Sequence, residues 1–175
     1  MTENKNVLVE VKDIKKEFVT AKTFTGKPMK IVHAVDNVNL TIYEGETIGV
    51  VGESGCGKST LGRSILRLID PTSGQILYRG EDITSYNKEQ MRKKMQLIFQ
   101  DPYASLNPRM TVLELIKAPL DAFNIGSNAE RIQKVKEIME LVGMPENMMN
   151  RYPHEFSGGQ RQRIVIARAL VLDPE

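Results

Sequence analysis

The first part of the chain alternates apolar and polar residues with the period of two that a half-buried β-strand requires. Residues 7–11 place a valine at every second position, and residues 14–18 continue this strand toward a polar turn. Residues 34–42 alternate in the same way, whereas residues 19–30 contain a glycine and a proline and predict a loop. The pattern therefore predicts an antiparallel β layer that leads into an α/β core.

Three short apolar runs predict further strands, because each is too short for a helix and is bounded by turn residues or polar residues. They cover residues 47–51, 75–78 and 95–99. The polar residues 87–94 predict a short exposed helix before the last of these runs.

From residue 101 onward the apolar residues recur with the period of a helix. Two of these helices carry a start signal, because Thr111 is followed by Glu114, and Ser127 by Glu130, at the spacing of a capping box. In a capping box the side chain and backbone donors of the first turn satisfy each other. The spacing therefore predicts two capped helices in this part of the chain.

A length of 175 residues allows one sizeable core with a subdomain. We predict a core over residues 1–100, a helical subdomain over residues 101–156, and a final helix over residues 157–175 that returns to the core. The net charge of +2, with acids and bases interspersed, gives no reason to expect a nucleic acid as partner. No apolar stretch is long enough to span a membrane, and the single Cys56 excludes an internal disulfide.

The strongest chemical signal is the spacing G-x-x-x-x-G-K-S directly after a predicted strand. In such a loop, backbone N–H groups surround phosphates and the next helix directs its positive end at them. Lys58 would reach the β- and γ-phosphates, and Ser59 would supply a hydroxyl to Mg²⁺. The apolar residues over 61–69 recur at helical spacing, while Arg63 and Arg67 face away from them. The residues that we expect to bind the nucleotide here are Gly52, Glu53, Ser54, Gly55, Cys56, Gly57, Lys58, Ser59 and Thr60.

A second motif, Ser157-Gly158-Gly159-Gln160, precedes an apolar helical run. One interpretation is a capping box, with Ser157 as N-cap and Gln160 at the third helical position. Two consecutive glycines are poor helix formers, however, so a purely structural start would not choose them. They suit a site at which an anion approaches the backbone amides of the helix N-terminus. The residues alone leave both interpretations open.

The phosphate loop, Gln100 after a strand, and the Ser-Gly-Gly-Gln motif, in this order and at these distances, resemble the ATP-binding subunits of ABC transporters. The strings IFQDPYASLNP at 98–108 and YPHEFSGGQRQR at 152–163 resemble the oligopeptide and dipeptide importers, in particular the second of their two ATPase subunits. The resemblance covers essentially the whole chain. It implies an α/β P-loop NTPase core of the ABC ATPase type, with an N-terminal antiparallel β layer, an inserted helical subdomain, and C-terminal core strands that are missing.

The resemblance also implies a nucleotide site shared by two subunits in a head-to-tail dimer. Lys58 and Gln100 would take part in catalysis, and Ser59 and Gln100 would meet Mg²⁺. The motif at 157–160 would contact the γ-phosphate of ATP bound to the opposite subunit. The function that it implies is ATP binding and hydrolysis coupled to peptide import.

An aromatic residue near the N-terminus usually stacks on adenine in this family. Phe18 is the first candidate and Phe24 the second, although either could be ordinary core. Tyr103 and the helical segment would face the coupling helices of membrane-spanning permease subunits. Through these partners the chain would be held at the cytoplasmic face of the cell membrane, and a peptide-binding protein would act with it indirectly.

In this family the sequence after Glu175 runs into the Walker B strand, whose acidic pair binds Mg²⁺ and positions the attacking water. Neither carboxylate is present here, and phosphoryl transfer depends on both, so we expect the chain alone to bind ATP weakly and to hydrolyse it negligibly. Two alternatives remain: a non-catalytic ATP-binding fragment, and an importer ATPase for another cargo such as nickel. A GTPase is excluded because residues 87–90 lack the aspartate of a guanine-reading motif.

Overall fold

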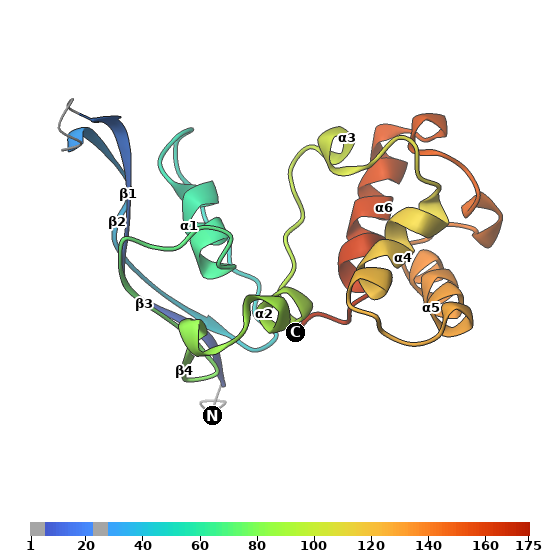
Figure 1. Cartoon of the computed structure of the whole chain (residues 1–175), viewed down its shortest axis with the longest axis horizontal. Coiled ribbons are helices and arrows are strands. Elements are labelled where there is room, and N and C mark those ends of the chain that lie inside the picture. Colours follow the sequence, from blue (N-terminus) through green and yellow to red (C-terminus); the bar gives the residue numbers. More distant parts are fainter. Residues whose placement is uncertain (1–5, 23–27) are drawn as a thin grey trace. The chain divides into compact units, whose positions relative to one another are not determined.

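The computed structural model describes residues 6–22 and 28–175, and it divides into two compact units, Met1–Met91 and Arg92–Glu175 (Figure 1). The first unit contains β1 (Val7–Lys22), β2 (Pro28–Tyr43), α1 (Lys58–Ile65), β3 (Ser73–Tyr78), β4 (Glu81–Asp82) and the 3-10 turn η1 (Ile83–Ser85). Helix α2 (Lys88–Lys94) includes the residues at which the division falls. The second unit contains α3 (Pro102–Ser105), α4 (Val112–Ala122), α5 (Asn128–Leu141), η2 (Glu146–Met148), η3 (Pro153–Glu155) and α6 (Gly158–Leu170).

Strand β1 lies inside a four-stranded antiparallel sheet with the order β2-β1-β3-β4. Val9 of β1 pairs with Ile42 of β2 on one side and with Tyr78 of β3 on the other. Val9 and Val11 of β1 are buried, whereas Glu10 between them is partly exposed, as the alternation predicts. The sheet therefore confirms the predicted antiparallel layer and the strand at 75–78.

The loop predicted over residues 19–30 is wrong at both of its ends, because β1 continues to Lys22 and β2 begins at Pro28. Val19 pairs with Ile31, and Ala21 with Lys30. Cross-strand pairing of β-branched residues has outweighed the local turn signals in this segment.

The strands predicted at 47–51 and 95–99 are also not observed. Both runs have no regular secondary structure and pair with no strand in the part of the chain that the structure describes. Val51 is 91% exposed and Phe99 is 47% exposed, which is unusual for apolar residues of this size. A strand of this kind requires lateral hydrogen-bonding partners, and residues 6–22 and 28–175 supply none for either run.

Helix α1 is shorter than its apolar pattern predicts. It ends at Ile65, and Leu68 of the predicted apolar face is exposed. Arg67 adopts a positive φ of 51° and turns its guanidinium back, so that it donates to the carbonyls of Ile83 and Tyr86 at 2.8 Å each. The prediction that Arg67 faces away is therefore wrong, because these carbonyls attract the cation inward.

The second unit is held together by a core between α4, α5 and α6. Fully buried members include Ile116 of α4, Met139 of α5 and Ile164 of α6. Among the residues that the structure describes, no helix has both the length and the apolar character needed to cross a bilayer. The unit thus folds as a small helical bundle around its own core.

Helices α4 and α5 begin with the predicted capping boxes. The Oγ1 of Thr111 accepts the N–H of Glu114 at 3.3 Å, and the Glu114 carboxylate accepts the N–H of Thr111 at 2.7 Å. Ser127 and Glu130 repeat the arrangement at 3.4 and 2.7 Å. The carboxylate of each glutamate accepts hydrogen bonds from the backbone N–H and from the hydroxyl of its cap residue. These bonds, of which the backbone bond has the larger effect, hold the pKa of Glu114 and the pKa of Glu130 below the ordinary value of 4.5.

The capping boxes predict how the stability of the helical unit depends on pH. Because the folded-state pKa of each glutamate is depressed, its stabilisation is complete above its unfolded pKa and is lost as the pH falls through the folded value. We expect the free energy of unfolding to fall between about pH 5 and about pH 3, and Glu130→Gln to weaken this dependence. The variant should keep its cap, because α6 begins with the same device and a glutamine, Gln160. Urea denaturation over this pH range measures the effect.

The control for this experiment is Glu140→Gln, which removes a carboxylate from an exposed position of the same helix. Its pH dependence should match that of the wild type. An identical slope for Glu130→Gln and the wild type would contradict the prediction.

Candidate functional site

The loop over residues 52–57 connects the apolar run at 47–51 to the start of α1. Gly55 and Gly57 adopt φ values of 84° and 96°, which side chains rarely allow. A Cβ at Gly57 would lie 1.9 Å from the carbonyl oxygen of Ala34 in β2. Glycine is therefore required here both by the backbone conformation and by this close approach.

Lys58 folds back over this loop. Its Nζ donates to the carbonyl of Gly52 at 2.7 Å and to the carbonyl of Glu53 at 2.6 Å, and it lies 3.5 Å from the Sγ of Cys56. The loop residues 52–56 are exposed. The ammonium is thus fixed at the loop by its own carbonyls, and the surrounding surface is open to an anion.

Helix α1 begins at Lys58 with Gly57 as its N-cap, and no side chain caps it. Its first turn also contains no acidic residue, in contrast to α4 and α5. Ser59 lies in this turn with an exposed side chain, and Thr60 follows it. The positive end of the helix therefore keeps its full attraction for an anion at the loop.

Phe18 lies in β1, in the same unit as the loop. It pairs with Val32 of β2, its side chain is 41% exposed, and the Nζ of Lys16 lies 5.2 Å from its ring centroid. Its exposure leaves one aromatic residue of this strand available for stacking. The second candidate, Phe24, lies outside the described residues.

Gln100 lies in the second unit, directly before Asp101, the N-cap of the short helix α3, and it is exposed. It borders a cavity of about 350 Å³ together with Phe99 and with Gln162 and Val165 of α6. Gln100 is therefore placed beside the helix that the second motif begins.

The second motif forms a complete capping box at the start of α6. The Oγ of Ser157 accepts the N–H of Gln160 at 3.4 Å, and the Oε1 of Gln160 accepts the N–H of Ser157 at 3.0 Å. Both glycines between them are exposed, and a Cβ at Gly158 or at Gly159 would meet nothing within 4 Å. The structural interpretation thus explains Ser157 and Gln160, and neither a positive φ nor internal packing explains the glycines.

The structure also shows two residues that the sequence does not single out. Arg161 and Arg168 extend from α6 to the segment that follows Gln100, where Arg161 stacks on Tyr103 and Arg168 donates to the carbonyl of Ser105. Their spacing of seven residues places both on one face of α6, which is the signal that the sequence contains.

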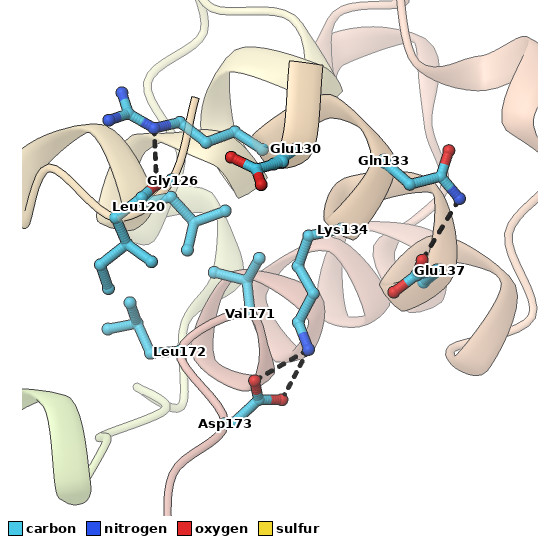
Figure 2. A pocket seen from close by; sticks show the side chains of 11 residues that line it. Leu120, Gly126, Glu130, Gln133, Lys134, Glu137, Val171, Leu172 and Asp173 are labelled. Carbon is cyan, nitrogen blue, oxygen red and sulfur yellow. Dashed lines mark hydrogen bonds and ion pairs between the residues drawn. The ribbon is translucent and has the colours of Figure 1, made fainter. Parts of the chain in front are cut away.

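No group of three acidic, histidine or cysteine side chains in residues 6–22 and 28–175 could hold a metal ion. A cavity of about 430 Å³ in the second unit is lined by none of the predicted site residues. Figure 2 shows its walls, which include Leu120, Val171 and Leu172, and the Lys134 ammonium that donates to the Asp173 carboxylate at 2.8 Å. Both cations that line the cavity are paired with carboxylates, Arg131 with Asp121 and Lys134 with Asp173, so neither charge is free for a phosphate.

Comparison with known families gives the class of protein first. The family model described as ABC transporter matches residues 35–175, so the chain belongs to the ABC transporter family. This confirms the resemblance on which the expected fold rests.

Within this family the chain is similar to oligopeptide transport ATP-binding proteins. It is 49% identical to AppF and 53% identical to OppF of Bacillus subtilis (strain 168), over 98% and 96% of this chain. It is 47% identical to OppF of Escherichia coli (strain K12) over 100% of this chain. In each case it covers 54% of the relative, so the chain spans about half the length of these proteins.

Solved structures give the same fold. The dimeric structure of MJ0796, a bacterial ABC transporter cassette, matches with a TM-score of 0.79 and 32% identity over 95% of this chain and 71% of that one. A post-hydrolysis state of the same cassette, bound to ADP and Pi, matches equally well. These matches confirm the predicted ABC ATPase fold.

We expect opposite effects on stability when a methyl group is added at Gly57, where the backbone requires glycine, and at Gly159, where the space is open. Gly159→Ala should leave the free energy of unfolding unchanged or raise it by up to about 1 kcal/mol, because alanine is the better helix former and its Cβ meets nothing. Gly57→Ala should lower it by at least about 1 kcal/mol, because the positive φ and the Ala34 carbonyl both oppose a Cβ. Chemical denaturation followed by circular dichroism measures both, and a destabilised Gly159→Ala would contradict the assignment of an open site.

Proposed function

We propose that this chain is the ATP-binding part of a subunit that couples ATP binding and hydrolysis to the import of peptides. The observation that carries the proposal is the fixed ammonium of Lys58 in an exposed glycine loop at the start of α1. A positive charge, free helix amides and an open surface together favour a nucleotide phosphate. The names of the similar relatives, which are oligopeptide transport proteins, support the choice of cargo.

In this proposal the phosphates lie against the loop over residues 52–57 and the first turn of α1. Lys58 remains on the loop carbonyls and directs its charge at the β- and γ-phosphates, while Phe18 stacks on the base. The exposed Ser59 hydroxyl and the exposed Gln100 amide oxygen are ligands of the kind that Mg²⁺ takes together with waters and phosphate oxygens. Bound Mg²⁺ would neutralise the charge that develops on the phosphates.

The second motif is proposed to bind ATP held by another subunit. Ser157 and Gln160 bond to each other, so the backbone around Gly158 and Gly159 is held in place with its outer side open. A γ-phosphate could approach this helix start closely because no side chain covers it. A head-to-tail pair of cassettes would bring each such motif to the partner's loop, and the dimeric state of the similar cassette MJ0796 supports such a pair.

The chain is proposed to act at the cytoplasmic face of the cell membrane, bound to permease subunits, with a peptide-binding protein supplying the cargo. Tyr103, which is 64% exposed on the helical unit, suits contact with a permease. Nucleic acid has no part in this proposal, because positive and negative residues are interspersed along the chain.

The first test concerns Lys58. We expect Lys58→Ala to weaken the binding of ATP with Mg²⁺ by at least about tenfold, because the variant removes the cation that faces the phosphates. Arg63→Ala is the matched control, since it removes the same charge from an exposed position of the same helix. Fluorescence titration with a labelled ATP measures both, and equal affinities of the two variants would contradict the proposed loop.

The second test concerns Gly159 in the assembled transporter. Gly159→Asp places a carboxylate where we propose the partner's γ-phosphate, so ATP-dependent pairing and peptide uptake should both fall by at least about tenfold while ATP binding at the loop is retained. Uptake of a radiolabelled tripeptide by cells, and crosslinking with and without ATP, measure the effect. Unchanged ATP-dependent pairing would contradict the proposed role of the motif. If the variant instead reduced the uptake of metal ions and left the uptake of peptides unchanged, the cargo would not be a peptide.

A further inference from the structure

Lys16 and Phe18 lie two residues apart in β1, and the ammonium of the first contacts the ring of the second. Residues at this spacing share one face of a strand. The Nζ of Lys16 lies over the ring, 5.2 Å from its centroid, and the same Nζ donates to the carbonyl of Asp70 at 2.7 Å. The ammonium is therefore held by the ring and by the segment between α1 and β3.

The partners of this ammonium are uncharged. Lys12 of the same strand forms an ion pair with the carboxylate of Glu10 at 2.9 Å. In the part of the chain that the structure describes, Lys16 instead contacts a carbonyl oxygen and an aromatic ring. Because no carboxylate neutralises its charge there, the negative face of the ring attracts the ammonium fully.

The backbone around Lys16 is fixed to the same segment. The N–H of Glu17 donates to the Oγ1 of Thr72 at 2.9 Å, and the N–H of Thr72 donates to the carbonyl of Lys15 at 2.8 Å. These two bonds hold the strand at the place from which Lys16 reaches both of its partners. The ring is thus supported by a fixed cation, and Phe18 remains 41% exposed.

The pairing of β1 with β2 places this contact beside the glycine loop. Strand β2 has one residue more than β1 between the partners of Lys16 and Glu17, and this extra residue is Ala34. The carbonyl of Ala34 is the group that approaches Gly57 closely. Since neighbouring strands lie about 4.8 Å apart and rise about 3.4 Å per residue, the backbone of Phe18 lies on the order of 10 Å from Gly57. That separation suits a nucleotide with its phosphates on the loop and its base on the ring.

We propose that Lys16 is a positioning residue for the base of the nucleotide, because it holds the Phe18 ring by one face and leaves the other face for the base. The inference rests on the proposed function, in which Phe18 stacks on the base, and it adds the residue that fixes the ring beforehand. A ring that is already fixed loses less conformational entropy when the base binds. Lys16 acts through the ring and not on the phosphates.

The first experiment tests the contact in the full chain without nucleotide. The chain contains no tryptophan, so Phe18→Trp introduces a single fluorescent reporter with an aromatic face for the cation. In this variant, Lys16→Ala should raise the acrylamide quenching constant by about twofold, because both faces of the ring become accessible. The matched control Lys12→Ala should leave it unchanged. An unchanged constant in Lys16→Ala, or an equal rise in Lys12→Ala, overturns the proposal.

The second experiment separates positioning from a direct effect of the charge on the phosphates. Calorimetry measures the binding of ATP and of inorganic tripolyphosphate, each with Mg²⁺. Lys16→Ala should weaken the binding of ATP about fivefold and that of tripolyphosphate by less than about twofold, because only ATP has a base. Lys16→Arg keeps a cation that can lie over the ring and should bind ATP within about twofold of the wild type. An equal loss for both ligands overturns the proposal, because the charge then acts on the phosphates.

A double variant tests whether Lys16 acts through the ring. Lys16→Ala combined with Phe18→Ala should bind ATP no more weakly than Phe18→Ala alone, because the ring on which Lys16 acts is already absent. Additive losses of affinity overturn the proposal. Lys12→Ala should stay within about twofold of the wild type for both ligands, because it removes only an exposed ion pair.

The proposed function and the role of Lys16 fail in distinguishable ways. A wild-type chain that binds neither ATP nor tripolyphosphate overturns both. A wild type that binds ATP, loses this binding in Lys58→Ala and keeps it in Lys16→Ala overturns the role of Lys16 and leaves the proposed function in place.

Discussion

The close approach of β2 to the start of α1 is the constraint on which the first unit depends. The carbonyl of Ala34 occupies the space that a side chain at residue 57 would need. This contact sets where α1 begins relative to the sheet, and Lys58 is its first residue. Because the backbone turns sharply at Gly57, the Lys58 ammonium can fold back onto the carbonyls of Gly52 and Glu53. The contact between β2 and Gly57 thereby helps to fix the Lys58 ammonium on the loop.

In the second unit, the start of α6 is held in place by side-chain hydrogen bonds and not by a close backbone contact. No carbonyl forces a glycine into the start of α6; instead the reciprocal bonds of Ser157 and Gln160 hold the backbone from both sides. Arg161 then supports the preceding turn through its bonds to Pro153 and His154. A Cβ at either glycine of α6 would meet nothing within 4 Å, which agrees with the proposal that an external group approaches them.

Local patterns predicted the parts of this protein that depend on neighbouring residues in the chain. The β1–β2 layer, both glutamate capping boxes and the glycine loop follow from spacing alone. The strands expected at 47–51 and 95–99 depend on lateral partners, which spacing cannot supply. Arg67 and Arg161 were not understood from the sequence for the same reason, because their carbonyl and aromatic partners lie far away in the chain.

The capping boxes that begin α4, α5 and α6 differ in one chemical detail, the group at the third helical position. Helices α4 and α5 use glutamate there, whereas α6 uses the uncharged Gln160 and α1 has no acidic residue in its first turn. Glutamate and glutamine accept the same backbone N–H, so either side chain can complete the cap. An anion does, because a carboxylate would cancel the positive field of the amides. The two helix starts that we propose to meet phosphate, those of α1 and α6, carry no acidic side chain in their first turns. The exchange of one oxygen for one nitrogen at Gln160 therefore leaves the positive field of α6 available to the anion that we propose.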